Sequence, residues 1–232
     1  MKTIVVIPSR GGSKRIPLKS LSHIGGKSML AKTIELALRV SIVDHVFVST
    51  DSSKIADEGL KFGAIVPGLR KSHSDEYSPV SLGTLSTVLE IEAEYALSES
   101  DLIIQLMPNC PFLVKDTIID FINYFKANTI ESLLSCILTD PLNRFAFEIN
   151  SDKTFKYVIP NTSRDKRTQD FSDLYIPTGA IWLASIGALK LHKSFYTPNM
   201  HFKPINQLEG FDIDTPEQLN FARTIDQTLL SN

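Results

Sequence analysis

Short apolar segments alternate along this chain with amphipathic ones, and this alternation constrains the fold more than any other feature. Four apolar runs without polar alternation lie at residues 3–7, 46–48, 102–106 and 133–138. Such runs are typical of strands buried on both faces of a parallel sheet. Amphipathic segments with helical spacing lie between them. The sequence therefore predicts an α/β fold: an open, mostly parallel, Rossmann-like sheet with flanking helices.

The helical segments are expected to turn one apolar face toward the sheet, because their apolar residues recur at a spacing of three to four. The residues expected to face inward are Leu30, Ile34, Ala37 and Leu38; Leu82, Leu85, Leu89, Ala93 and Ala96; Ile118, Ile119, Ile122 and Phe125; and Leu219, Ala222 and Ile225. Thr215 is expected to cap the last helix, with Pro216 at its first position.

Residues 140–176 interrupt this pattern. They are rich in charges and contain short alternating pieces at 145–149 and 155–159, which is typical of a hairpin. An apolar strand returns at 180–183. We therefore expect residues 1–139 and 177–232 to form one α/β domain, with 140–176 as an inserted, hairpin-bearing region.

Composition excludes several classes of protein. A net charge of -2 argues against a general nucleic-acid binder, and two cysteines are too few for a disulfide framework or a thiolate zinc site. Five histidines show no metal-ligand spacing. No apolar stretch approaches the roughly 20 residues of a membrane span, and the N-terminal apolar run is too short for a signal peptide. We expect a cytoplasmic protein that does not associate with a membrane.

The loop after the first expected strand, residues 7–19, is the most informative segment. Gly11 and Gly12 allow a tight turn in which backbone N–H groups can meet an anion. Four cations lie within ten residues: Arg10, Lys14, Arg15 and Lys19. A polyphosphate is a natural partner for such a loop, and a solvated basic loop is the alternative. The spacing excludes a dinucleotide fingerprint, and residues 25–28 imitate a Walker A motif without a preceding strand.

Two carboxylates, Asp212 and Asp214, lie two positions apart near the C-terminus. On an extended segment their side chains share a face, so both can converge on one Mg²⁺. The alternative for Asp214 is an N-cap of the last helix.

Six segments resemble, in order, the motifs of the acylneuraminate cytidylyltransferases, or CMP-sialic acid synthetases. Residues 7–19 resemble the motif Ile-Pro-Ala-Arg-Gly-Gly-Ser-Lys-Arg-Ile-Pro-x-Lys-Asn, and residues 105–111 resemble Gln-Pro-Thr-Ser-Pro. The others are residues 48–51, 66–70 with 74–75, 167–170 with 178–182, and 212–215, the last matching Asp-Ile-Asp-Thr. One such motif is weak, but six in order identify the chain as a member of this family.

The resemblance implies a reaction in which CTP and a 2-keto-3-deoxy sugar acid give the CMP-sugar and pyrophosphate, with Mg²⁺. Related enzymes activate neuraminic, legionaminic or pseudaminic acids. It also implies a homodimer in which the inserted hairpin reaches the partner's active site.

The resemblance also assigns roles to residues. Arg10, Lys19 and Asp214 are the expected catalytic residues, and Asp212 and Asp214 the metal ligands. The expected nucleotide-binding residues are Arg10, Gly11, Gly12, Ser13, Lys14, Lys19, Ser20 and Arg70. The expected sugar-binding residues are Gln105, Arg167, Thr178, Gly179, Ala180, Trp182, Phe195 and Tyr196. The alternatives are a solvated arginine at 70, a strand-end polar residue at 105, and core roles for the aromatic residues.

The chain departs from the family motifs at several positions. Ser20 and Thr178 each replace an asparagine, and Asn109-Cys110 replaces Thr-Ser. Because several departures fall on the expected sugar side, we expect a sugar acid, or an acyl group, different from that of N-acetylneuraminate. Two other functions remain open: a metal-dependent glycosyltransferase, and a non-catalytic nucleotide-sugar binding homologue.

Overall fold

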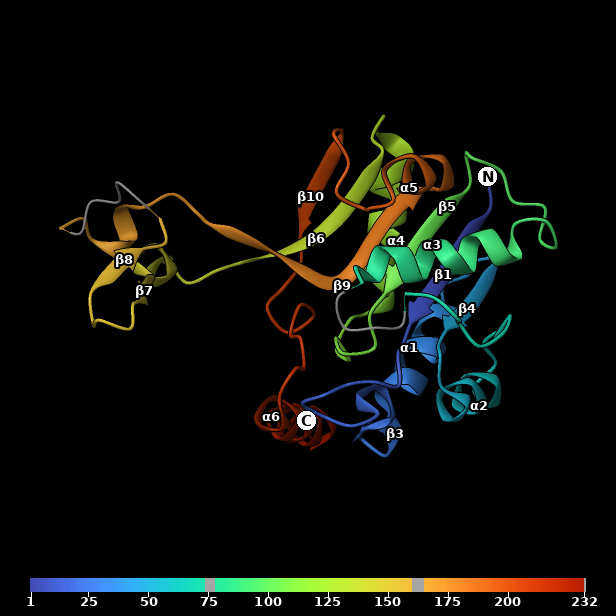
Figure 1. The fold of residues 1–232 in the computed structure, drawn as a ribbon, viewed down its shortest axis with the longest axis horizontal. Helices are drawn as coiled ribbons and strands as arrows, with labels where there is room; N and C mark the ends of the chain where they lie inside the picture. Colours follow the sequence, from blue (N-terminus) through green and yellow to red (C-terminus); the bar gives the residue numbers. More distant parts are fainter. Residues whose placement is uncertain (74–77, 160–164, 232) are drawn as a thin grey trace.

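The computed structural model describes residues 1–73, 78–159 and 165–231. Its centre is a six-stranded sheet in the order β10-β6-β9-β5-β1-β4 (Figure 1). The strands are β1 (Thr3–Pro8), β4 (His45–Ser49), β5 (Leu102–Leu106), β6 (Ser132–Leu138), β9 (Tyr175–Ser185) and β10 (Met200–Pro204). β1 is parallel to β4 and β5, and β10 is parallel to β6, whereas β9 is antiparallel to β5 and β6. The predicted α/β fold with a mostly parallel sheet is confirmed.

Helices cover both faces of this sheet: α1 (Met29–Leu38), α2 (Ser53–Lys61), α3 (Val80–Ile91), α4 (Lys115–Ala127) and α5 (Ile186–His192). The last helix, α6 (Pro216–Ser231), packs instead in a third buried cluster with residues that include Ile16, Ile24 and Ile213. Successive side chains of β1 point to opposite faces, as pleating requires. Val5 and Ile7 therefore pack in one core cluster with α1, α2 and α4. Ile4 and Val6 pack in a second cluster with α3 and α5.

Two of the predicted helical faces need correction. Leu38, at the end of α1, is 50% exposed. On α3 the prediction was largely wrong: of its five residues only Leu85 is buried, Leu89 is 54% exposed, and the helix ends at Ile91, before Ala93 and Ala96. The residues of α3 that face inward include Ser81, Thr84, Leu85, Thr87, Val88 and Ile91.

The reason for the error on α3 is that three inward side chains, those of Ser81, Thr84 and Thr87, are polar. Thr84 donates a hydrogen bond to Gln105 (2.6 Å) and Thr87 donates one to Ser49 (2.6 Å). Both acceptors lie on buried strands. Hydroxyls that find acceptors in this way can be buried without an unpaired polar group, so hydrophobic spacing misreads the helix.

The entry to α1 is a turn, which explains the imitation of a Walker A motif at residues 25–28. A small antiparallel pair, β2 (His23–Ile24) and β3 (Lys27–Ser28), leads into the helix, with Gly25 and Gly26 at positive φ between the strands. Ser28 caps α1 by accepting a hydrogen bond from the backbone N–H of Ala31 (3.0 Å). Residues 25–28 therefore form a hairpin turn and a helix cap.

The interruption at 140–176 contains the predicted hairpin. Strands β7 (Phe147–Ile149) and β8 (Phe155–Tyr157) form a separate two-stranded sheet, accompanied by 3₁₀ helices η2 (Pro141–Phe145) and η3 (Thr168–Asp170). Figure 1 shows this arm projecting away from the six-stranded sheet. Phe147 and Phe155 are 53% and 59% exposed. The domain boundaries and the role of the arm in dimerisation stay predictions.

Candidate active site

A cavity of about 500 Å³ opens where β1 and β5 end. Ligands bind at the carboxyl ends of strands in open α/β sheets, so its position is the one that the fold favours. The lining combines the loop after β1 with residues that come from much later in the chain. Those residues include Arg10, Ser13, Lys14, Arg15, Lys19, Ser20, Arg70, Met107, Asn109 and Asp214.

The loop is closed at its base by two serines. Ser9 donates a hydrogen bond to Ser20 (2.6 Å), and both side chains are buried. Lys19 and Ser20 belong to a short 3₁₀ helix, η1 (Lys19–Leu21). Leu18, the residue before this helix, has a left-handed backbone conformation. Ser20, the departure from the family asparagine, therefore ties the end of the loop to its beginning.

The two glycines of the loop differ. A Cβ at Gly11 would lie 3.0 Å from the Cβ of Ser52, so the loop packs closely there, whereas Gly12 has open space. The backbone N–H of Gly11 donates to Asp51 (2.7 Å). In this structure the Gly11 N–H is thus directed to a carboxylate, contrary to the expectation that both glycines present N–H groups to an anion.

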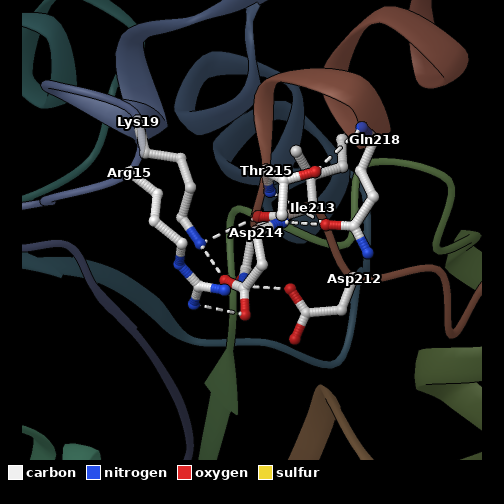
Figure 2. Close-up of polar contacts among 8 residues, drawn as sticks. Arg15, Lys19, Asp212, Ile213, Asp214, Thr215 and Gln218 are labelled. Carbon is white, nitrogen blue, oxygen red and sulfur yellow. Dashed lines mark hydrogen bonds and ion pairs between the residues drawn. The ribbon is translucent and has the colours of Figure 1, made fainter.

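Asp214 joins the loop to the C-terminal part of the chain (Figure 2). Lys19 Nζ lies 2.8 Å from Asp214 Oδ1, and Arg15 Nη2 lies 2.8 Å from Oδ2. Lys19 also donates to the backbone carbonyl of Ile213 (2.8 Å). Burial disfavours the ionised carboxylate, but the hydrogen bonds and charges of Lys19 and Arg15 outweigh it and lower the pKa of Asp214. Arg15, a loop cation to which no role was assigned, is therefore part of this network.

The N-cap alternative for Asp214 is wrong. Thr215 caps α6 by accepting a hydrogen bond from the backbone N–H of Gln218 (3.3 Å). The side-chain carbonyl of Gln218 in turn accepts from the backbone N–H groups of Thr215 (2.9 Å) and Asp214 (2.8 Å). The predicted cap by Thr215 is confirmed, and with Gln218 it forms a capping box. The spacing of Thr215 and Gln218 is a recognisable sequence signal for this box, but no role had been predicted for Gln218.

Asp212 has different surroundings from Asp214. The side-chain amide of Asn109 donates to Asp212 Oδ1. Burial raises the pKa of Asp212, and the neighbouring charge of Asp214 raises it further. Between the two carboxylates Ile213 is fully buried, and its N–H donates to the Asn109 carbonyl (2.9 Å). The two carboxylates lie close enough to interact electrostatically, as their spacing suggests.

A metal cage made only of protein side chains is not present in the described part of the chain. No group of three or more His, Cys, Asp or Glu residues there is arranged to hold a metal ion. Burial and the nearby carboxylates raise the pKa of Cys110 well above its usual range, so this thiol stays neutral. The carboxylate oxygens at this end of the cavity are those of Asp214, which lines it, and of the neighbouring Asp212.

Arg70 is held against α3 rather than solvated. Its Nη1 donates to Ser49 Oγ (2.9 Å), and a Cβ at Gly83 would lie only 2.7 Å from the same nitrogen. Burial lowers the pKa of Arg70, while the charge of Asp51 raises it and that of Arg10 lowers it. Arg70 thus belongs to the cavity lining together with Arg10. The accompanying segment at 74–75 lies outside the described residues.

Gln105 is not among the residues that line the cavity. It is fully buried in β5 and accepts a hydrogen bond from Thr84. The motif Gln-Pro-Thr-Ser-Pro has its glutamine directly before a proline, and in this chain Met107 precedes Pro108. Met107 does line the cavity, and a Cβ at Gly179 would lie 3.4 Å from its Cγ. The same Cβ would lie 3.9 Å from Asp212, which brings Met107, Gly179 and Asp212 together.

The remaining residues expected to bind sugar occupy varied positions. Trp182 is half-buried, donates to the Thr178 carbonyl (2.6 Å), and packs against Phe195 and Tyr196 at 5.7 Å between ring centroids. Phe195 is fully buried behind Trp182, and Tyr196 is 47% exposed. The Thr178 hydroxyl lies 2.7 Å from that of Ser135. Phe195 therefore has the core role that was left as an alternative.

Two further residues of the predicted sugar set lie away from the cavity lining. Ala180 is fully buried in β9. Arg167 lies in the arm segment, where it is exposed and paired with Asp170 (2.9 Å). Neither residue is brought to the cavity within one chain.

The sequence matches the family model described as cytidylyltransferase over residues 4–231. A pseudaminic acid cytidylyltransferase of Campylobacter jejuni subsp. jejuni serotype O:2 is 29% identical, over 97% of this chain and 96% of that protein. A CMP-N,N'-diacetyllegionaminic acid synthase of Legionella pneumophila is 30% identical, over 93% of this chain and 92% of that protein.

A solved structure of CMP:2-keto-3-deoxy-manno-octonic acid synthetase complexed with CTP has a similar fold. The TM-score is 0.75 at 18% sequence identity, over 99% of this chain and 100% of that one. No helix in the described ranges is long and apolar enough to span a membrane. The family match covers nearly the whole chain, including the basic loop and the Asp212–Asp214 segment, so the protein is a nucleotidyltransferase that belongs to the cytidylyltransferase family.

Proposed function

We propose that this protein activates a nonulosonic sugar acid by transferring to it the cytidylyl group of CTP. The anomeric hydroxyl oxygen of the sugar acid forms a bond to the α-phosphorus. The bond between that phosphorus and the bridging oxygen breaks, and pyrophosphate leaves. The proton of the hydroxyl is released to water in the same reaction.

The observation that carries this proposal is the cavity that brings the basic loop against the Asp212–Asp214 segment. Phosphoryl-type transfer depends on positioning and charge neutralisation more than on covalent help from the protein. Arg10, Lys14 and Lys19 supply cations for the triphosphate on one side of the cavity. Arg70, held against α3, is in a position to contact the nucleoside.

We further propose that Asp212 and Asp214 hold Mg²⁺. Burial raises the pKa of Asp212, and the charge of Asp214 raises it further; a divalent cation would relieve the repulsion between the two carboxylates. Mg²⁺ commonly binds one or two carboxylates and completes its shell with substrate phosphates and water, so two carboxylates suffice. When bound, the ion would neutralise charge that develops on the phosphate oxygens. Lys19 and Arg15, which form ion pairs with the Asp214 carboxylate in this structure, would then be available to the triphosphate.

The sugar acid is proposed to differ from N-acetylneuraminate. Met107 contributes a thioether, a weak acceptor and no donor, where the family motif has glutamine. A substrate hydroxyl buried against it would lack a strong partner, whereas a methyl or methylene group would pack well. The relatives named for pseudaminic and legionaminic acids are consistent with this choice.

A homodimer is also part of the proposal. The arm exposes Phe147 and Phe155, whose rings pack against each other at 5.7 Å and share no core with the six-stranded sheet. A second copy of the chain would cover this apolar surface and would bring Arg167 near a partner's cavity. A cytoplasmic location fits the proposal, because CTP is made and used there.

Pyrophosphate release from a panel of nucleotides and sugar acids tests the proposal. We expect release with CTP and a nonulosonic acid, and little with ATP, GTP or UTP. Legionaminic or pseudaminic acid should give a higher kcat/KM than N-acetylneuraminate, and Met107→Gln should narrow the gap. Binding of CTP without pyrophosphate release would instead favour the non-catalytic homologue. A clear preference for N-acetylneuraminate would overturn the sugar assignment.

A further inference from the structure

We infer that Gln218 is a positioning residue for the reaction, because it fixes the backbone of Asp214. This inference rests on the proposed function of Asp214. The side-chain carbonyl of Gln218 accepts two backbone N–H groups, those of Asp214 (2.8 Å) and Thr215 (2.9 Å) (Figure 2). Both bonds are accepted by the same oxygen atom, at the start of α6.

The bond to Asp214 goes beyond what a helix cap needs. In a capping box the third residue of the helix satisfies the N–H of the cap residue, here Thr215. Gln218 satisfies that N–H and also the one before it. That additional N–H belongs to the residue whose carboxylate faces the basic loop, so the bond constrains the residue that we assign to the metal.

The side chain of Asp214 cannot by itself keep this position during the reaction. Its two oxygens are held by Lys19 and Arg15, both at 2.8 Å. These cations line the same cavity that we assign to the triphosphate, which would compete for them. Once they turn to the phosphates, the contacts that hold Asp214 within the protein would be mainly those of its backbone. Gln218 holds it from the helix side, independently of the loop.

The neighbouring residues complete this support. Ile213 is fully buried and its N–H is bonded to the Asn109 carbonyl (2.9 Å), which anchors the middle of the segment. Gln218 anchors its end. With both anchors in place, the carboxylates of Asp212 and Asp214 keep a defined separation. This separation matters because small displacements of reacting groups lower the reaction rate strongly.

Two substitutions at position 218 separate the acceptor from the shape of the side chain. Gln218→Met keeps the length and helix propensity but removes the acceptor oxygen. We expect kcat to fall roughly tenfold or more, with the KM for CTP changed less than about twofold. Gln218→Glu keeps an acceptor at this position and should restore most of the lost turnover.

Thr215→Ala is the matched control. It removes the other half of the capping box and should lower the melting temperature about as much as Gln218→Met. It leaves the bond from Asp214 to Gln218 intact, so kcat should stay within about twofold of the wild type. Hydrogen exchange of the Asp214 amide, followed by NMR, should accelerate in Gln218→Met but not in Thr215→Ala.

Equal losses of kcat in Gln218→Met and Thr215→Ala would overturn the inference, because helix stability would then explain both. Unchanged exchange of the Asp214 amide in Gln218→Met would overturn it as well. If the wild-type protein releases no pyrophosphate, the proposed function fails. The exchange comparison then decides by itself whether Gln218 fixes Asp214.

Discussion

The rim of the cavity and the projecting arm are organised in opposite ways. At the rim, polar side chains from distant parts of the sequence meet in a network in which Asp214 contacts Lys19 and Arg15. In the arm, Phe147 and Phe155 lie close together in sequence, are half exposed, and pack on each other and on Tyr157. The rim network forms within one chain, whereas the rings of the arm stay half exposed to solvent.

This difference indicates where each region draws its stability and its role. The rim is positioned by the basic loop and α6, which pack in a buried cluster of their own that includes Ile16, Ile213 and Leu219. A change of a polar rim side chain should therefore alter chemistry more than folding. None of the described arm residues belongs to that cluster or to the two core clusters of the sheet. A change in the arm should alter association more than either the sheet or the rim. Five variants, three of them with matched controls, test this contrast.

The largest effect is expected for Asp214→Ala. It removes the carboxylate that we assign to Mg²⁺ and that pairs with the loop, so kcat should fall by about 10²–10³-fold. Folding should be largely intact, because Asp214 is partly exposed and such ion pairs contribute about 1 kcal/mol or less. Pyrophosphate release and urea unfolding measure the two effects.

Asp120→Ala is the control for that variant. Asp120 also pairs with a lysine, Lys203 at 3.1 Å, but it does not line the cavity. It should leave kcat unchanged. Near-normal turnover of Asp214→Ala would refute the metal role.

Lys19→Ala should have the next largest effect. It removes one preorganised charge donor from the triphosphate, at a cost of at least about 2 kcal/mol, or roughly 30-fold in kcat/KM. Steady-state kinetics with CTP would measure the loss, and Lys203→Ala offers a control that removes a paired lysine elsewhere. A loss confined to the KM for the sugar acid would argue against a contact with the triphosphate.

A double substitution in the arm, Phe147→Ser with Phe155→Ser, tests the other side of the comparison. Removing both rings from a dimer interface should weaken association by tenfold or more, because truncating a buried aromatic residue at an interface commonly costs about 2 kcal/mol of binding free energy. The unfolding free energy of the sheet should change by less than about 0.5 kcal/mol. Analytical ultracentrifugation measures the association.

Phe221→Ser is the matched control for the arm. Phe221 is 57% exposed on α6, similar to the arm residues, and lies outside the arm. It should leave the oligomeric state unchanged. Equal dissociation in both variants, or a wild-type monomer, would rule out the arm as the interface.

The smallest expected effect is on stability and depends on pH. The pKa of Asp212 is raised in the folded state, so the folded state binds a proton more tightly than the unfolded state. Stability from this group therefore falls as pH rises through the window between its unfolded and its raised folded pKa. Asp212→Asn should be more stable than the wild type at neutral pH, and the advantage should vanish in acid.

For Asp214→Asn, the change in stability with pH should have the opposite sign. The pKa of Asp214 is lowered in the folded state, so its contribution to stability is present above the unfolded pKa. That contribution is lost as pH falls through the lowered folded pKa. Urea unfolding of both variants across acidic and neutral pH would compare them, and equal pH profiles would contradict the assignment of different surroundings.

Much of the fold followed from local patterns. Residues 3–7 and 102–106 are continuous apolar runs, and burial on both faces of a sheet leaves little alternative for them. The face of α3 could not be predicted, because Thr84 and Thr87 are buried through hydrogen bonds to residues on other strands. The antiparallel course of β9 also escaped prediction, since pairing with β5 and β6 is a long-range property.

The candidate site divides in the same way. The basic loop and the Asp212–Asp214 pair were recognisable from residue type and spacing. The assignment of Gln105 was not supported by its place in the structure, because its position in β5 buries it while Met107 reaches the cavity. Arg15 and Gln218 had no assigned role, since their contacts with Asp214 depend on segments about 200 residues apart meeting, or on a capping geometry.

By itself, then, the sequence determined the α/β class, the place of the phosphate loop after the first strand, and the family of the enzyme. These depend on local periodicity and on the order of short motifs. Only the tertiary structure decided which side chains share the cavity and which residues hold Asp214 in place. Contacts of that kind are set by packing between elements far apart in the chain, and no local pattern encodes their distances.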